Sequence, residues 1–146
     1  MAREIWLDMD GTIADFYATE GWLEHLENES TFPYEVAKPL VNMNILARYL
    51  NRLQKMGYKI GILTAVAKNA TAPYAEKIKR AKAEWLKKHL RSVRFDDIEY
   101  IAYTTIKNTR NKGNDILFDD EDRHLSKWTG TAVNAKYIME TLRTMR

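Results

Sequence analysis

The sequence predicts an α/β fold, a Rossmann-like three-layer sandwich with a mostly parallel five-stranded sheet. The first observation behind this prediction is that short apolar segments alternate with amphipathic helical segments along the chain. The second is that three apolar segments end on polar residues, namely Asp8, Thr64 and Asp119. Because ligands bind beyond the carboxyl ends of parallel strands, these residues are expected to meet at one edge of the sheet.

Length and composition indicate one domain over residues 1–146. Of the 146 residues, 45% are hydrophobic, which is enough for a core and too many for a disordered chain. The absence of cysteine excludes thiolate metal sites, and three histidines far apart in sequence argue against a zinc site. We expect a cytoplasmic protein with no membrane partner, because no apolar run approaches about 20 residues and no signal-peptide pattern is present. A net charge of +3 suits a phosphorylated substrate without arguing for nucleic acid.

The first half of the chain contains two predicted strands, separated by an insertion and a helix. An apolar run at about residues 4–8 predicts the first strand. The aromatic residues and prolines that follow indicate a small cap insertion after this strand, at about residues 16–42, with a short helix over residues 17–27 and loop elsewhere. Apolar spacing then predicts a helix over residues 44–56, ended by Gly57, and a second strand over residues 59–64.

The second half continues the alternation. Residues 73–90 predict a long helix, and residues 98–103, 115–118 and 131–133 predict three further strands. Residues 121–128 predict a short helix, and residues 135–146 predict a closing one. A basic series along and after the long helix is interpreted as a solvated face, with a track for a polynucleotide as the alternative. It consists of Lys77, Lys79, Arg80, Lys87, Lys88, Arg91 and Arg94.

Asp8 and Asp10 are the most informative residues of the chain. They are spaced by one residue at the end of the first strand, so an extended backbone places both side chains on the same side. Two carboxylates this close raise each other's pKa unless a cation lies between them. Gly11 then permits a sharp turn. The pattern predicts a metal site with a nucleophile; a plain turn is the alternative, while a calcium loop would need further acidic positions that are absent.

Four segments resemble the ordered motifs of the haloacid dehalogenase-like phosphatase superfamily. They are Asp8-Met9-Asp10-Gly11-Thr12, Ile62-Leu63-Thr64, a later lysine, and Ile116-Leu117-Phe118-Asp119-Asp120. Residues 8–16, 64–68, 82–85 and 115–120 are similar, more narrowly, to the 5'(3')-deoxyribonucleotidases. The resemblance implies a magnesium-dependent phosphomonoesterase that hydrolyses nucleoside monophosphates, with deoxyribonucleotides favoured, through an aspartyl-phosphate intermediate.

The same resemblance implies a role for each acidic residue of the motifs. Asp8 would be the nucleophile, and Asp10 would protonate the leaving group and then activate water. Asp8, Asp119, Asp120 and the backbone carbonyl of Asp10 would provide the magnesium site, because Mg²⁺ prefers hard oxygen ligands. From the last of the four motifs, either Asp119 or Asp120 would be the direct metal ligand.

The phosphate site would be formed by Thr64, the backbone N–H groups that begin at Ala65, and a lysine that neutralises charge. Lys68 lies four residues after Thr64, where the nucleotidases place a phosphate contact. Lys107 follows the third predicted strand, and Lys82 lies at the margin of the apolar stripe of the long helix. We favour Lys107 as the catalytic lysine, with Lys82 as the alternative.

Phe16 matches a residue that packs on the base in the nucleotidases, with packing inside the cap as the alternative. Trp85 is expected in the core, and His25, His89 and His124 are expected to be surface or structural residues. Two other functions are weighed against the nucleotidase. One is a phosphatase for the 3'- or 5'-phosphate ends of DNA or RNA, and the other is a non-catalytic binding or regulatory module on the same fold.

Overall fold

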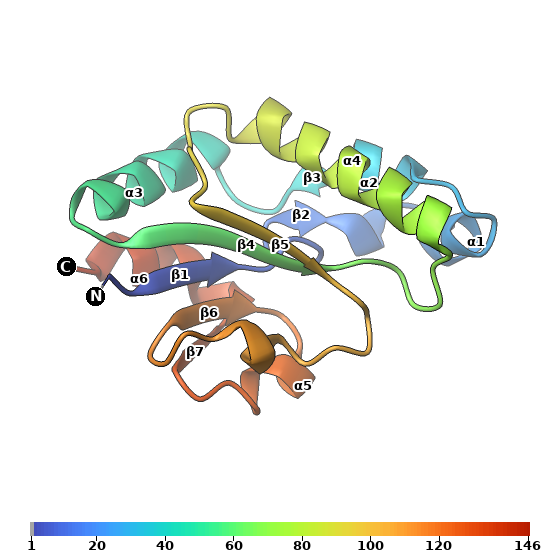
Figure 1. Ribbon diagram of the computed structural model, residues 1–146. Helices are drawn as coiled ribbons and strands as arrows, with labels where there is room; N and C mark the ends of the chain where they lie inside the picture. Colours follow the sequence, from blue (N-terminus) through green and yellow to red (C-terminus); the bar gives the residue numbers. More distant parts are fainter. Residues whose placement is uncertain (1) are drawn as a thin grey trace.

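The computed structural model describes residues 2–146 and has the predicted α/β architecture (Figure 1). Its central sheet contains five strands in the order β5-β4-β1-β6-β7, and every neighbouring pair is parallel. The sheet is therefore parallel throughout, rather than mostly so. The strands are β1 (Glu4–Leu7), β4 (Lys59–Ala65), β5 (Asp97–Ile101), β6 (Ile116–Asp119) and β7 (Thr131–Asn134).

One face of the sheet carries the larger part of the core. Helices α3 (Met43–Lys55), α4 (Ala72–His89) and α6 (Ile138–Thr144) contribute buried side chains to this face. They pack with alternate residues of the central strands, such as Ile5 and Leu7 of β1. Figure 1 shows α3 and α4 along the same side of β4. The predicted helices at residues 44–56 and 73–90 are thus both present, within one residue at each end.

The opposite face buries a smaller cluster. Trp6, Leu63 and Leu117 point to this side of their strands, and Trp128 packs with them. Trp128 follows α5 (Asp122–Leu125), a helix of one turn that is shorter than the predicted segment at residues 121–128. Since β1 is buried on both faces, its apolar run is nearly continuous instead of alternating.

The insertion after β1 folds as a small cap with more regular structure than its composition predicts. It contains the two-residue strand β2 (Ala14–Asp15), the 3₁₀ helix η1 (Phe16–Ala18), α1 (Trp22–Glu27), α2 (Phe32–Val36) and β3 (Lys38–Pro39). The antiparallel pairing of β2 with β3 holds the two ends of the cap together. The predicted helix over residues 17–27 is wrong in its first turn, and the expected loop contains α2. Pro33 lies in the first turn of α2, where a missing N–H costs little.

The cap is anchored to α4. The Tyr74 hydroxyl donates a hydrogen bond to the carbonyl of Ser30 (2.7 Å), and the Trp85 indole N–H donates to the carbonyl of Ala37 (2.8 Å). Trp85 is buried, as predicted for a core residue. In Figure 1, α1 lies beyond the carboxyl ends of β1 and β4. The cap therefore forms a wall beside the sheet edge at which the motif residues are expected.

The closing helix and the basic face of α4 lie at the outside of the molecule. The closing segment consists of η3 (Ala135–Tyr137) and α6, and none of the helices within residues 2–146 is both long and apolar enough to cross a membrane. The seven basic residues interpreted as a solvated face are exposed except for Lys79, which is half-buried. Lys82, on the same helix, is buried and does not belong to this face. Lys79 pairs with Glu76 and Lys87 pairs with Glu84, one turn away along the helix.

Candidate active site

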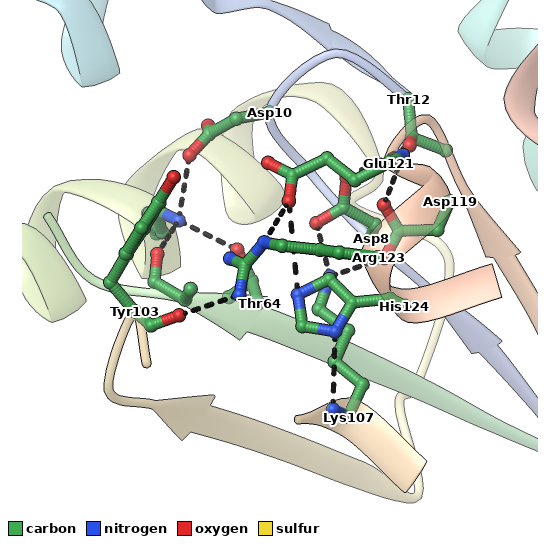
Figure 2. Close-up of polar contacts among 12 residues, drawn as sticks. Asp8, Asp10, Thr12, Thr64, Tyr103, Lys107, Asp119, Glu121, Arg123 and His124 are labelled. Carbon is green, nitrogen blue, oxygen red and sulfur yellow. Dashed lines mark hydrogen bonds and ion pairs between the residues drawn. The ribbon is translucent and has the colours of Figure 1, made fainter. Parts of the chain in front are cut away.

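Polar side chains from four neighbouring strands meet at one edge of the sheet (Figure 2). Asp8 follows β1, Thr64 lies near the end of β4, Asp119 ends β6, and Lys107 lies in the 3₁₀ helix η2 (Lys107–Arg110) after β5. All four side chains are buried. The expected convergence of Asp8, Thr64 and Asp119 is therefore present, and it encloses charged groups that need partners.

Lys107 bridges the carboxylates of two adjacent strands. Its Nζ atom donates to Asp8 Oδ1 at 2.7 Å and to Asp119 Oδ2 at 2.6 Å. Burial favours the neutral amine, but the charges of Asp8 and Asp119 outweigh it and raise the pKa of Lys107 above its ordinary value. Lys107 is therefore an ammonium group held between the predicted nucleophile and a predicted metal ligand.

Lys82 occupies the other side of the site. Its Nζ atom donates to Asp10 Oδ2 (2.9 Å), to Thr64 Oγ1 (2.6 Å) and to the backbone carbonyl of Ala65 (2.7 Å). The side chain comes from α4 and is buried, as expected for a lysine at the margin of an apolar stripe. Both lysines considered for catalysis thus enter the site, one beside each aspartate of the first motif. Lys68 is exposed, and its Nζ atom lies 6.0 Å from the centre of the Tyr103 ring.

The two aspartates of the first motif have opposite electrostatic environments. Burial raises the pKa of Asp8, but the nearby charges and hydrogen bonds, chiefly those of Lys107, more than offset it and hold this pKa below its usual range. Burial raises the pKa of Asp10, and the negative charge of Asp8 adds to the effect despite the contact with Lys82. Thr12 also donates to Asp8 Oδ2 (2.9 Å), a contact to which the sequence assigned no role. Asp8 is therefore an ionised and oriented carboxylate, while Asp10 retains a proton more readily.

Three carboxylates form a cluster that can hold a metal ion. Asp8, Asp119 and Asp120 each offer one oxygen, and these oxygens lie within 4.8 Å of one another. Burial and the charge of Asp8 raise the pKa of Asp119 to about 6 and that of Asp120 to about 8. The carboxylate of Asp10 is directed to Lys82 instead, so its side chain is not part of the cluster. Both Asp119 and Asp120, which the sequence left as alternatives, lie beside Asp8.

The donor set and the charge count fit a divalent cation. When the four carboxylates of Asp8, Asp10, Asp119 and Asp120 are all ionised, the two ammonium groups of Lys82 and Lys107 that contact them leave two negative charges. A divalent ion would balance these charges. The cluster offers oxygen atoms alone, and these are the ligands of hard cations such as Mg²⁺.

Gly11 makes room for the third carboxylate of this cluster. Its φ is +84°, and a Cβ atom at this position would overlap the carboxylate of Asp120. The turn that follows the first motif therefore requires glycine for its backbone conformation and also for the close approach of Asp120.

Gly11→Ala is expected to weaken metal binding by about tenfold or more, because the new methyl group displaces Asp120 from the cluster. Loss even of a group that only supports a metal ligand costs about 10–100-fold in affinity. Isothermal titration of the metal-free protein with Mg²⁺ measures this effect. Gly113→Ala is the matched control, since Gly113 also has positive φ but a Cβ there has no atom within 4 Å. Equal losses in both variants would show that backbone strain, and not the contact with Asp120, is responsible.

A pocket of about 540 Å³ opens above these residues. Asp8, Asp10 and Lys107 line its floor, and the cap and the segments after β4, β5 and β6 form its walls. Phe16 lines the pocket but is only 3% exposed, because its ring packs against those of Tyr17, Trp22 and Tyr34. Tyr17 is 45% exposed and also lines the pocket, so it offers more of its ring to a ligand than Phe16 does.

Sequence reasoning missed the wall formed by Tyr103, Glu121, Arg123 and His124, all of which line the pocket. Arg123 Nε donates to Glu121 Oε2 at 2.6 Å, and its guanidinium lies over the Tyr103 ring. His124 is buried within the site and is not a surface residue. The available signal was the position of Glu121, Arg123 and His124 directly after Asp119-Asp120, on a helix that starts at the same sheet edge.

The chain matches no protein-family model and no curated protein.

Proposed function

We propose that this chain is a magnesium-dependent phosphomonoesterase of the haloacid dehalogenase-like superfamily, acting on nucleoside monophosphates through an aspartyl-phosphate on Asp8. The observation that carries the proposal is the position of an ionised, buried carboxylate, Asp8, between the Lys107 ammonium and an aspartate cluster able to hold a cation. A plain turn would not need two buried lysines from distant segments. A non-catalytic module would not need the opposite electrostatics of Asp8 and Asp10.

Asp8 is arranged for attack on phosphorus. Lys107 and Thr12 hold its two oxygens, which limits the orientations of the carboxylate. A carboxylate is a weak nucleophile, so catalysis depends on positioning and on neutralisation of the phosphoryl charge. Lys107 supplies one such charge from the chain itself. A cation held by Asp8, Asp119 and Asp120 would neutralise further negative charge on the phosphoryl group.

Asp10 is arranged for proton transfer at the opposite side. Its raised pKa favours a protonated carboxyl that donates a proton to the leaving oxygen. After the leaving group departs, the ionised Asp10 would take a proton from the water that hydrolyses the aspartyl-phosphate. Lys82 contacts this carboxylate and Thr64 Oγ1 together, which links Asp10 to the end of β4. Thr64 itself is fully buried and does not line the pocket, so its predicted contact with a phosphoryl oxygen stays a prediction.

The pocket suits a substrate of nucleotide size that carries an aromatic base. Its volume of about 540 Å³ lies within the roughly 300–1,000 Å³ typical of small-molecule sites. The cap contributes the rings of Tyr17 and Trp22, and the opposite wall contributes that of Tyr103. Stacking between a nucleobase and an aromatic side chain contributes about 1–3 kcal/mol in single-strand binders.

A panel of phosphate esters tests the proposal. Nucleoside monophosphates, sugar phosphates, p-nitrophenyl phosphate and phosphate-ended oligonucleotides are incubated with the protein and Mg²⁺, and released phosphate is measured. We expect hydrolysis with the highest kcat/KM for nucleoside monophosphates, and none in the presence of a chelator. Preference for oligonucleotides, with activity that falls steeply as salt is added, would favour the phosphatase for nucleic-acid ends. If the protein hydrolysed none of these esters, the proposal that it is a phosphomonoesterase would be wrong.

Tyr17→Ala is expected to raise KM for nucleoside monophosphates by about tenfold, which corresponds to the loss of one stacking contact. The KM for glycerol phosphate, which has no ring, should change little. Steady-state kinetics on both substrates provide the comparison, with Phe32→Ala as the control because Phe32 is a similarly exposed aromatic residue of the cap that does not line the pocket. A similar rise for both substrates would mean that Tyr17 does not contact the base.

A further inference from the structure

The helix α5 holds the segment that carries Lys107 at two points. Arg123 Nη1 donates to the carbonyl of Tyr103 at 2.9 Å, and the guanidinium lies 4.4 Å from the centre of the Tyr103 ring. The next residue, His124, accepts a hydrogen bond from the backbone N–H of Lys107 at its Nδ1 atom, with a distance of 3.2 Å (Figure 2). Two consecutive residues of α5 therefore contact both ends of the connection between β5 and η2.

The N–H of Lys107 has a specific need for this acceptor. Lys107 is the first residue of η2, and the residue before it, Ile106, makes no side-chain capping bond. N–H groups in the first turn of a helix have no acceptor within that helix. This N–H is buried, and His124 Nδ1 is the acceptor that it has within residues 2–146. Without His124, a buried donor would be left without a partner at the position that sets the Lys107 side chain.

The hydrogen bond also fixes the protonation pattern of the imidazole. Because Nδ1 accepts from Lys107, its lone pair is occupied and the proton of the neutral ring lies on Nε2. His124 is 1% exposed, and its Nε2 atom has no hydrogen-bond partner; the nearest carboxylate oxygen, Glu121 Oε2, lies 3.8 Å away. Burial, with the charges of Lys107 and Arg123, lowers the pKa of His124 to about 4, so the ring is neutral at pH 7.

We propose that His124 is a positioning residue for catalysis: its Nδ1 atom fixes the Lys107 backbone, so that the Lys107 ammonium lies between Asp8 and Asp119. This inference rests on the proposed function, in which Lys107 neutralises the phosphoryl group. The ammonium contacts both carboxylates at 2.6–2.7 Å, so a small shift of the backbone removes at least one contact. Displacement of such a group lowers the rate of the chemical step without removing the substrate site.

The first experiment measures the contact without any substrate. Nitrogen-15 NMR of the histidine side chains in the full chain at pH 7 should show a neutral ring with a proton on Nε2, and its resonance should disappear in His124→Asn. Amide hydrogen exchange at Lys107 should be slow in the wild type and in His124→Asn, whose Oδ1 atom replaces Nδ1 as acceptor. Exchange should be at least about tenfold faster in His124→Leu. A proton on Nδ1, or an imidazolium ring, would overturn the inference.

The second experiment measures the consequence for the reaction. His124→Asn should keep kcat within about threefold of the wild type, whereas His124→Leu should lower kcat by about 10–100-fold with little change in KM, as for other supporting contacts of active sites. His124→Gln is the second variant, since it keeps an amide but places it at the Nε2 position, and it should resemble His124→Leu. His89→Asn is the control, because His89 packs on Trp85 in the last turn of α4 and does not line the pocket.

The outcomes separate the two proposals. Equal kinetic losses in His124→Asn and His124→Leu, together with equal thermal unfolding, would show that the ring only fills space and would overturn the positioning role. A wild-type protein that hydrolyses no ester would refute the proposed function, while the NMR and exchange measurements would still decide whether His124 holds Lys107. If His124→Leu does not fold, the comparison of His124→Asn with His124→Gln decides the same question.

Discussion

Asp8→Asn is expected to lower kcat by about 10⁴-fold or more while leaving the fold intact, because removal of a covalent nucleophile has effects of this size. An amide does not attack phosphorus, and it contributes no charge to the aspartate cluster. Thr12 and Lys107 remain in place, and Lys107 keeps its contact with Asp119. Steady-state phosphate release measures the loss, and far-UV circular dichroism verifies that the variant is folded.

Asp122→Asn is the matched control for this variant. Asp122 is exposed and lies in the first turn of α5, near the site but outside the pocket and the aspartate cluster. It should keep close to wild-type activity. If Asp8→Asn also remained active, Asp8 would not be the nucleophile, and the aspartyl-phosphate mechanism would be wrong.

Lys107→Met is expected to lower the free energy of unfolding by about 3–5 kcal/mol in the absence of metal, because it removes one partner of a buried ion pair. Methionine retains much of the volume of the lysine stem but leaves Asp8 and Asp119 without their shared cation. Urea denaturation in the presence of a chelator gives the free energy of unfolding. Addition of Mg²⁺ should restore part of the loss, since a cation in the aspartate cluster would take over the neutralisation.

The pH dependence of Lys107→Met provides an internal check. Without Lys107, the pKa of Asp119, which is already raised, moves further above its unfolded value, and Asp8 loses the main charge that holds its pKa low. A raised carboxyl pKa makes the folded state bind more protons, so the stability of the variant should increase as the pH falls from 8 towards 5. Lys68→Met, which removes an exposed lysine at the same pocket, should change stability little. If Lys107→Met were as stable as the wild type in the presence of a chelator, the contacts of Lys107 with Asp8 and Asp119 would not stabilise the fold.

The sheet and the sources of its site residues were predictable from local patterns. Strands β1, β4 and β6 are short apolar runs that end abruptly on polar residues, and burial on both faces produces this pattern in parallel sheets. Asp8, Thr64 and Asp119 could therefore be assigned to one edge before their contacts were known. The stripe of α4 likewise indicated that Lys82 lies at the border of the core.

Other parts of the site depend on contacts that no local pattern encodes. The strand pairing that closes the cap joins two residues with two, which is too short for a periodic signal. The helix α2 has only five residues, so it was predicted as loop. Lys82 reaches Asp10 across 72 positions of the chain, and His124 accepts from Lys107 across 17. For Phe16 the sequence left two alternatives, packing on a base or packing inside the cap, and the rings of Tyr17, Trp22 and Tyr34 surround it within the cap.

Trapping the aspartyl-phosphate is the decisive test of whether Asp8 receives the phosphoryl group beside a bound divalent cation. Asp10→Asn removes the group proposed to activate water, so the aspartyl-phosphate should accumulate in this variant. The variant is mixed with a nucleoside monophosphate and Mg²⁺, quenched in acid and digested, and the peptides are analysed by mass spectrometry. One phosphoryl group should be found on Asp8. It should not form when a chelator is present from the start, and it should be absent from the Asp8→Asn, Asp10→Asn double variant. Phosphate release with Asp8 unmodified, or a phosphoryl group on another residue, would show that Asp8 is not the nucleophile.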